Sequence, residues 1–237
     1  MDFTQSKTSP CIFKWNLIEN YPIIYLGLYV DNFIYFSQSK EVETKFEQEF
    51  QSHVPVTFKS KINYFLGVRF HNTCHKDGHI DIALSQTAYI DNLCKHTKLN
   101  SPEINTPKSP YRSGFPIDTV PDETYNDITQ KRLTTQLQTI IGLLNWLSVS
   151  TCLDITTATS LVTKYCQNPS KGHIDAALYI VKYLKGTQTM KMKFSSQDNK
   201  DLQSFIQFPL PQQQLFGLCD TNWGHRTNQK HYQIAPP

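Results

Sequence analysis

The most chemically suggestive residues of this 237-residue sequence are Asp31 and Asn32, which interrupt one long apolar run. The run covers Ile23–Phe36, and Tyr29 and Val30 directly precede the acidic residue. Two apolar strands that meet in a tight turn would present Asp31 at the tip of a hairpin. A carboxylate beside apolar surface is costly unless a partner or a metal ion compensates its charge. Asp and Asn are also ordinary turn residues, so a surface β-turn is the alternative interpretation.

A second group of potential metal ligands consists of His71, Cys74, His75 and His79. These residue types suit zinc, but structural zinc sites use more regular pairs such as Cys-x₂₋₄-Cys. The group flanks a hairpin turn predicted by Asp77-Gly78, and alternate strand residues point to opposite faces. The favoured interpretation is therefore an exposed turn without a metal.

A basic excess in the C-terminal half is opposed by a single acidic residue, Asp175. The lysines are Lys164, Lys171, Lys182, Lys185, Lys191 and Lys193. They could line a track for phosphates, because such contacts supply much of the affinity for nucleic acids. A solvated charged face is the alternative. His173 lies near the start of a predicted helix with no nucleophile nearby in sequence, which favours a structural role.

The composition is that of a mildly basic chain with one large or two small domains and enough residues to bury a core. The net charge of +3 and the pI near 8.4 permit a polyanionic partner without requiring one. The longest apolar run is far shorter than the roughly 20 residues that cross a bilayer. The N-terminus has no basic segment followed by an apolar one. We expect no signal peptide, no membrane partner and a cytoplasmic or nuclear location. The six cysteines are scattered, which indicates a reducing compartment.

Apolar periodicity and turn residues predict the secondary structure of the N-terminal part. The expected elements are strands over 11–15 and 23–36, a helix over 41–50, a hairpin of 62–70 with 79–84, and a helix from an N-cap at Ser85 to about residue 98. Five prolines between residues 101 and 121 prevent a continuous helix or strand, so this segment is predicted to be a linker.

Three helices are predicted after the linker. The first, over 127–148, carries an apolar stripe of Leu133, Leu137, Ile140, Ile141, Leu144 and Leu147. The second is expected to begin at an N-cap formed by Asp154, and the third to run from Ser170 to Lys185 and end with Gly186 at C′. A strand over 190–194, a polar loop over 195–213 and a last strand over 215–220 complete the prediction.

Short motifs follow one another along the chain in a specific order. They are Tyr29-Val30-Asp31-Asn32, Tyr64-Phe65-Leu66-Gly67-Val68, Leu84-Ser85-Gln86 with Tyr89-Ile90, Asn105-Thr106-Pro107, Ile141-Gly142-Leu143-Leu144 with Trp146-Leu147, Asp154-Ile155, His173 with Ala176-Ala177, Tyr183-Leu184-Lys185-Gly186-Thr187, and Cys219-Asp220-Thr221-Asn222-Trp223-Gly224. This series strongly resembles the C-terminal part of copia-type retrotransposon polyproteins, from the reverse transcriptase palm to the first strand of RNase H. The resemblance covers about residues 9–225.

The resemblance implies an α+β fold with an antiparallel palm sheet, thumb helices and a helical connection. The implied divisions are a partial palm and thumb at 1–100, a proline-rich linker at 101–126, a helical connection at 127–187, and a truncated RNase H start at 188–237. Because half of the palm would be missing, we expect uncovered apolar surface on the first hairpin.

The resemblance also implies site residues and a cofactor. Asp31 matches the first Asp of the family's Tyr-Val-Asp-Asp hairpin, and Asn32 replaces the second. In the family these carboxylates and an upstream palm Asp hold Mg²⁺ for RNA-directed DNA synthesis on an RNA template with a DNA primer. No residue of this chain matches the upstream Asp. We therefore expect no nucleotide transfer by this chain alone. The alternative is a non-catalytic nucleic-acid-binding protein or an inert transposon remnant.

Two further motifs of the family carry over. The primer grip corresponds to Tyr64, Phe65, Leu66 and Gly67, for which an apolar strand with a bulge glycine is the alternative. Asp220 matches the first metal-binding Asp of RNase H, although Asn222 stands where the family has a second Asp. A surface carboxylate at a strand end is the favoured interpretation of Asp220. Nucleic-acid contacts are assigned to Lys164, Lys171, Lys182 and Lys185.

Overall fold

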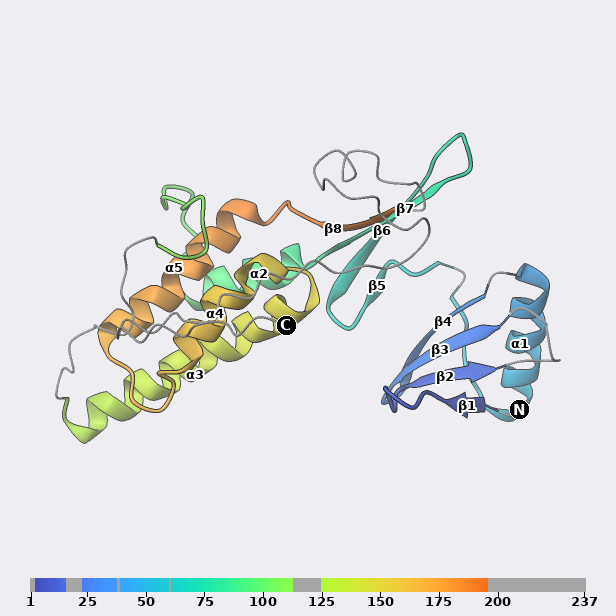
Figure 1. Cartoon of the computed structure of the whole chain (residues 1–237), viewed down its shortest axis with the longest axis horizontal. Helices are drawn as coiled ribbons and strands as arrows, with labels where there is room; N and C mark the ends of the chain where they lie inside the picture. Colours follow the sequence, from blue (N-terminus) through green and yellow to red (C-terminus); the bar gives the residue numbers. More distant parts are fainter. Residues whose placement is uncertain (1–2, 16–22, 38, 60, 113–124, 196–237) are drawn as a thin grey trace, which may run out of the picture. The chain divides into compact units, whose positions relative to one another are not determined.

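The computed structural model divides the chain into two compact units, residues 1–62 and residues 63–237 (Figure 1). The structure describes residues 3–15, 23–37, 39–59, 61–112 and 125–195. Each unit combines an antiparallel sheet with helix, which confirms the predicted α+β class. Within the described ranges, no helix has the length and apolar character that a membrane span requires.

The first unit is a four-stranded antiparallel meander followed by a helix. The strands β1 (Phe3–Gln5), β2 (Ile12–Trp15), β3 (Ile24–Tyr29) and β4 (Asn32–Ser37) lie side by side in chain order. Helix α1 (Lys40–His53) contacts β3 and β4 and begins after Ser39, whose side chain accepts a hydrogen bond from the Val42 backbone N–H. The predicted strands and the predicted helix are confirmed.

The core of the first unit is dominated by aromatic rings around Phe46. Ile24 and Leu26 are buried on one face of β3, while Tyr25 between them is exposed on the other, as the period of a strand requires. The rings within 6.4 Å of Phe46 belong to Phe3, Trp15, Tyr35, Phe50 and Phe58. Complete burial of a side chain such as Phe46 contributes about 1.5–3 kcal/mol to stability.

The opposite face of this sheet exposes apolar side chains. The rings of Tyr25 and Phe36 stack with centroids 5.1 Å apart, and Phe36 is 61% exposed. Ile12, which pairs with Gly27 on this face, is exposed as well. The expectation of uncovered apolar surface on the first hairpin is confirmed for the described residues.

The second unit contains a four-stranded sheet whose last strand follows the helices in the chain. Its strands are β5 (Tyr64–Phe65), β6 (Val68–Cys74), β7 (Ile80–Ser85) and β8 (Met192–Ser195), in that order. The predicted single strand over 62–70 is wrong. The chain reverses at Leu66 and Gly67, where φ is +49° and +81°, as in a type I′ turn. In Figure 1, β8 lies beside β7, with which it pairs in antiparallel register.

The helices of the second unit share one apolar core. They are α2 (Thr87–His96), α3 (Asp127–Ser150), the short 3₁₀ helix η2 (Leu153–Ile155), α4 (Thr156–Thr163) and α5 (Lys171–Thr187). The predicted stripe of α3 is buried at all six positions. Helix α5 contacts α2, α3 and α4, and Ile90 and Leu93 of α2 belong to the same core. The core therefore joins residues from both sides of the proline-rich segment.

Three predicted helix ends differ from the structure. Ser85 ends β7, and Gln86 occupies the N-cap of α2 without a side-chain cap bond. Asp154 lies within η2, and its carboxylate accepts a 2.5 Å hydrogen bond from the Tyr183 hydroxyl. Gly186 lies inside α5, which continues to Thr187. Tertiary hydrogen bonds and packing override the local end signals at these positions.

The proline-rich segment lies against α5. Residues 101–112 form neither helix nor strand, as the prolines predict. The Lys185 ammonium donates to the Ser101 carbonyl, and Thr106 lies close to Gly186. The boundary between the two compact units falls between Ile62 and Asn63. Ser195, where the predicted loop was to begin, is the last residue of β8, and the rest of that loop and the predicted strand over 215–220 fall outside the described residues.

The close approach at Gly186 gives a stability prediction. A Cβ at this position would lie 2.7 Å from Thr106 Cβ, so Gly186→Ala should force the two segments apart. Overpacking costs about 1–3 kcal/mol, against a gain of about 1 kcal/mol in helix propensity. We expect a net loss of about 1 kcal/mol in the free energy of unfolding, measured by urea denaturation.

A matched control exists in α3. Gly142 is exposed, and a Cβ there meets no atom within 4 Å. Gly142→Ala should therefore raise the unfolding free energy by up to about 1 kcal/mol. In a Thr106→Gly background, Gly186→Ala should change from destabilising to stabilising. Equal stabilisation by both single Gly→Ala changes would contradict the packing.

Candidate functional site

The β3–β4 hairpin presents Asp31 at an exposed turn, as predicted. Leu28 pairs with Phe33 and Tyr29 pairs with Asn32, so Val30 and Asp31 form a two-residue connection. Asp31 and Asn32 are both exposed. The strands below them stay paired as far as Ile24 and Ser37, which gives the turn a rigid base.

Val30 adopts a backbone conformation that is unfavourable for its residue type. Its φ is +51°, in the left-handed region, and its side chain is 77% exposed. A β-branched residue in this region is an outlier, and the conformation costs roughly 1–2 kcal/mol. The strand pairing on both sides of the turn therefore holds Val30 in a strained position beside Asp31.

The hairpin tip supplies few ligands for a hard cation. Asp31 contributes a carboxylate, while Asn32 contributes a neutral amide carbonyl. Mg²⁺ prefers oxygen ligands, and a catalytic pair of ions needs several negative charges around it. Within the part of the chain that the structure describes, Asp31 does not belong to a group of three potential metal ligands. The tip alone can orient one hydrated cation at most.

The segment that corresponds to a primer grip forms a second tight hairpin. Tyr64 and Phe65 of β5 pair with Arg69 and Val68 of β6. Tyr64 is exposed, while Phe65, Leu66 and Gly67 are half-buried. An ideal Cβ at Gly67 would lie 3.7 Å from Trp146 Nε1, so the turn lies close to α3. The alternative interpretation of Gly67 as a bulge glycine is wrong, because Gly67 is the second central residue of a turn.

Three of the four predicted nucleic-acid-binding lysines share one side of α5. Lys182 and Lys185 lie 11 and 14 residues after Lys171, which is close to three and four helical turns. Lys164 lies at the end of α4. Lys185 donates to the Ser101 carbonyl, and the Lys171 ammonium lies 5.7 Å from the centre of the Tyr125 ring. Lys164, Lys171 and Lys182 therefore remain as candidates for phosphate contacts.

A basic groove that the sequence analysis missed lies between the end of α2 and the N-terminal half of α3. Its volume is about 640 Å³. Its cationic or titratable lining residues are His96, Lys98, Lys131 and Arg132. Hydroxyl and amide groups of Thr135, Gln136 and Thr139 line the groove too. The adjacent basic residues Lys131 and Arg132 were the only sign of this groove in the sequence. Lys98 comes close to them only because α2 packs on the other helices.

His173 has the structural role that its lone position favoured. It occupies the third position of α5, where its Nδ1 accepts a 2.9 Å hydrogen bond from the Ser170 backbone N–H. The Ser170 side chain in turn accepts from the His173 backbone, which completes a capping box. The imidazole is buried and stacks on Tyr165 at 4.0 Å. Asp220, the proposed RNase H ligand, falls outside the described residues.

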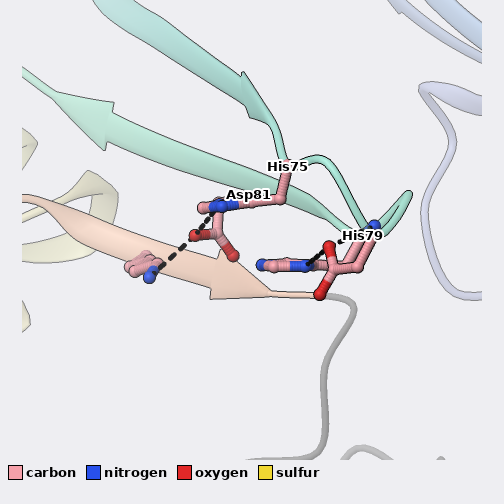
Figure 2. A network of polar contacts seen from close by, with 5 residues as sticks. His75, His79 and Asp81 are labelled. Carbon is pink, nitrogen blue, oxygen red and sulfur yellow. Dashed lines mark hydrogen bonds and ion pairs between the residues drawn. The ribbon is translucent and has the colours of Figure 1, made fainter.

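The four candidate zinc ligands separate into different environments. His71 Nε2 lies 2.9 Å from Ser85 Oγ, and burial, together with Lys191 and Arg69, lowers the pKa of this imidazole. Cys74 is exposed. His75 and His79 stack at 3.7 Å and gather around an acidic residue that the sequence analysis did not select, Asp81 (Figure 2). Of the four candidate ligands, only His75 and His79 belong to this group.

Asp81 is a buried carboxylate held by neighbouring charges. Its Oδ2 accepts from the Lys193 ammonium at 2.8 Å and lies 3.0 Å from His75 Nε2. The Lys193 hydrogen bond, the Ser195 hydroxyl and His75 together hold the pKa of this carboxyl well below its usual range. Asp81 is therefore ionised at neutral pH and ties β8 to β7.

Comparisons with known proteins give two informative relatives. A transposon Ty5-1 protein of Saccharomyces cerevisiae is 24% identical over 173 residues, which cover 73% of this chain and 52% of that protein. A retrovirus-related Pol polyprotein from transposon TNT 1-94 of Nicotiana tabacum is 24% identical over 201 residues, which cover 83% of this chain and 14% of that polyprotein. The chain is similar to transposon-encoded proteins.

These similarities relate the chain to transposon-encoded proteins at low sequence identity. The chain spans about half the length of the yeast relative and about one seventh of the tobacco polyprotein. No family model matches the chain, and no solved structure matches it.

The strained turn beside Asp31 gives a prediction for the hairpin. Val30→Asn should stabilise the β3–β4 pair by about 1 kcal/mol, because Asn tolerates the left-handed region better than Val. Amide hydrogen exchange of β3 and β4 in the full chain should then slow by roughly fivefold. Val30→Thr is the matched control, because it keeps the β-branch and should bring no gain. Equal protection in the Asn and Thr variants would contradict the strain.

Proposed function

We propose that the chain derives from the reverse transcriptase part of a copia-type retrotransposon polyprotein, and that by itself it binds nucleic acid without synthesising DNA. The observation that carries this proposal is the β3–β4 hairpin, whose exposed turn presents Asp31 followed by Asn32. The similarity to transposon proteins from yeast and tobacco supports the origin.

The hairpin has the geometry that a polymerase palm would use for metal-bound chemistry. Its strands are packed on α1 through Ile24 and Leu26, so the turn projects from a fixed support. Two Mg²⁺ ions in a polymerase align the primer hydroxyl and offset the charge of the triphosphate. With Asn32 in place of a carboxylate, and no residue that matches the upstream palm Asp, Asp31 alone cannot hold both ions. Nucleotidyl transfer is therefore not expected from this chain alone.

Nucleic-acid binding is supported by the basic surfaces of the second unit. The groove between α2 and α3 combines Lys98, Lys131 and Arg132 with hydroxyl groups, a set that suits phosphate oxygens. Lys171 and Lys182 on α5 offer a second, more dispersed row. The ligand class that fits both is a nucleic-acid backbone, and an RNA–DNA duplex is the form that the origin implies.

A primer-extension assay tests the catalytic part of the proposal. With Mg²⁺, an RNA template and a DNA primer, the full chain should give no template-dependent synthesis. Asn32→Asp should give none either, because restoring one carboxylate leaves the upstream ligand unmatched. Asp31→Asn serves as the matched control. Synthesis by the wild type or by Asn32→Asp that is lost in Asp31→Asn would contradict the proposal.

Fluorescence anisotropy with an RNA–DNA duplex tests the binding part. Affinity should fall between about 50 mM and about 200 mM salt, because each phosphate contact contributes roughly 0.9 to the slope of log affinity against log salt. The double change Lys131→Gln and Arg132→Gln should weaken binding and lower the slope by up to about 2.

Two controls separate the basic surfaces in this binding assay. Lys45→Gln removes an exposed lysine that pairs with Glu41 on α1, and it should leave binding unchanged. The double change Lys171→Gln and Lys182→Gln measures the contribution of the α5 row. Salt-independent affinity would rule out phosphate contacts by these lysines. No binding at low salt would leave an inert remnant as the correct description.

A further inference from the structure

We propose that His75, His79 and Asp81 form a binding site for a divalent transition-metal ion, with zinc as the best-suited ion, at the end of the β6–β7 hairpin. One ligand atom of each residue lies within 4.8 Å of the other two. Figure 2 shows the two imidazole rings lying one over the other, with both extending toward the Asp81 carboxylate. This site belongs to the second unit, whereas the hairpin that carries Asp31 belongs to the first.

The hairpin brings the three residues together through its register. Strand pairing ends at Cys74 and Ile80, and the turn is then closed by a 3.0 Å hydrogen bond from the His75 N–H to the His79 carbonyl. His75 and His79 therefore face each other across the hairpin. Asp81 lies in β7, two residues after His79, and side chains two residues apart in extended backbone point to the same face. Gly78, with a φ of +87°, permits the reversal.

Neighbouring groups orient the ligand atoms. The Asp77 carboxylate is hydrogen-bonded to His79 Nδ1, which leaves Nε2 of His79 as the nitrogen for a metal. A carboxylate that fixes the other ring nitrogen is the usual partner of a metal-binding histidine. His75 directs Nε2 at Asp81 Oδ2, 3.0 Å away, so a metal would replace the proton shared by these two atoms.

The donor set selects the class of ion. Two imidazole nitrogens and one carboxylate oxygen suit Zn²⁺, Co²⁺ or Ni²⁺, whereas Mg²⁺ and Ca²⁺ prefer oxygen ligands throughout. Zinc–ligand distances near 2.0–2.1 Å place tetrahedral ligands about 3.4 Å apart, so ligand atoms that are up to 4.8 Å apart must approach by up to about 1.4 Å. The turn residues Lys76 and Asp77 are exposed, which leaves room for this adjustment. Three protein ligands leave a fourth position for water.

Lys193 competes with a metal for the same carboxylate. Its ammonium lies 2.8 Å from Asp81 Oδ2, and its side chain is 61% exposed, so it can move into solvent when a cation binds. Removing this lysine should therefore tighten metal binding, whereas removing a ligand should abolish it. If removal of Lys193 tightens metal binding while removal of a ligand abolishes it, the cluster is a metal site and not a purely structural polar cluster.

The test is a zinc titration of the full chain without a histidine tag, and isothermal titration calorimetry measures the binding. We expect one ion per chain, loss of binding in His79→Ala and Asp81→Asn, and tighter binding in Lys193→Met. Asp77→Asn should weaken binding by about tenfold or more. His53→Ala is the matched control, because His53 is an exposed histidine at the end of α1 in the other unit.

Far-UV circular dichroism of each variant checks that it remains folded. The cobalt-substituted wild type should show the visible absorption of a tetrahedral site, and a folded Lys193→Met should show it at lower cobalt concentration. Unchanged zinc affinity in a folded His79→Ala would overturn the proposal. Equal losses in His79→Ala and His53→Ala would assign the binding to dispersed surface histidines and would overturn it too.

Discussion

The packing of β3 and β4 against the Phe46 ring cluster is the constraint on which the N-terminal unit depends. Because Ile24 and Leu26 must both face α1, the register of the hairpin is set, and a shift of one residue would expose both. That register places the reversal at Val30 and Asp31 and keeps the carboxylate in solvent. The same constraint holds Val30 in a left-handed conformation that its own residue type disfavours.

Hairpin ends carry the candidate chemistry in both units. Asp31 lies at the β3–β4 turn, the Leu66–Gly67 turn lies beside α3, and His75 and His79 face each other at the β6–β7 turn. In each case the paired strands supply rigidity, and the turn at Asp31 is exposed whereas Leu66 and Gly67 are half-buried. The helices contribute differently, because their apolar stripes build the core and leave basic residues such as Lys131 on the outer surface.

The sequence predicted elements best where one physical signal dominated. The apolar stripe of α3 follows from helical periodicity, and the strands around Asp31 follow from one apolar run interrupted by turn residues. The turn at Leu66 was missed because it lacks the Asn-Gly or Asp-Gly signal. Asp154 was expected to cap a helix, but its bond to Tyr183, 29 residues away, could not be inferred from local spacing.

The candidate sites show the same limit. Asp31 could be placed at a turn because its neighbours are apolar on both sides. Asp81 could not be grouped with His75 and His79, because their proximity depends on cross-strand register and on ion pairing with Lys193 from β8. The groove at Lys98 and Arg132 likewise exists only after α2 has packed on the helix core.

The central claim is that the hairpin tip retains one carboxylate of a former two-metal site. The most direct test is a Mg²⁺ titration in which NMR monitors the backbone amide signals of residues 29–33. The account predicts small shifts that keep growing into the range of tens of millimolar, as expected for a single exposed carboxylate. Saturation of the Asp31 and Asn32 signals below about 1 mM Mg²⁺ would reveal a complete metal site and contradict the account.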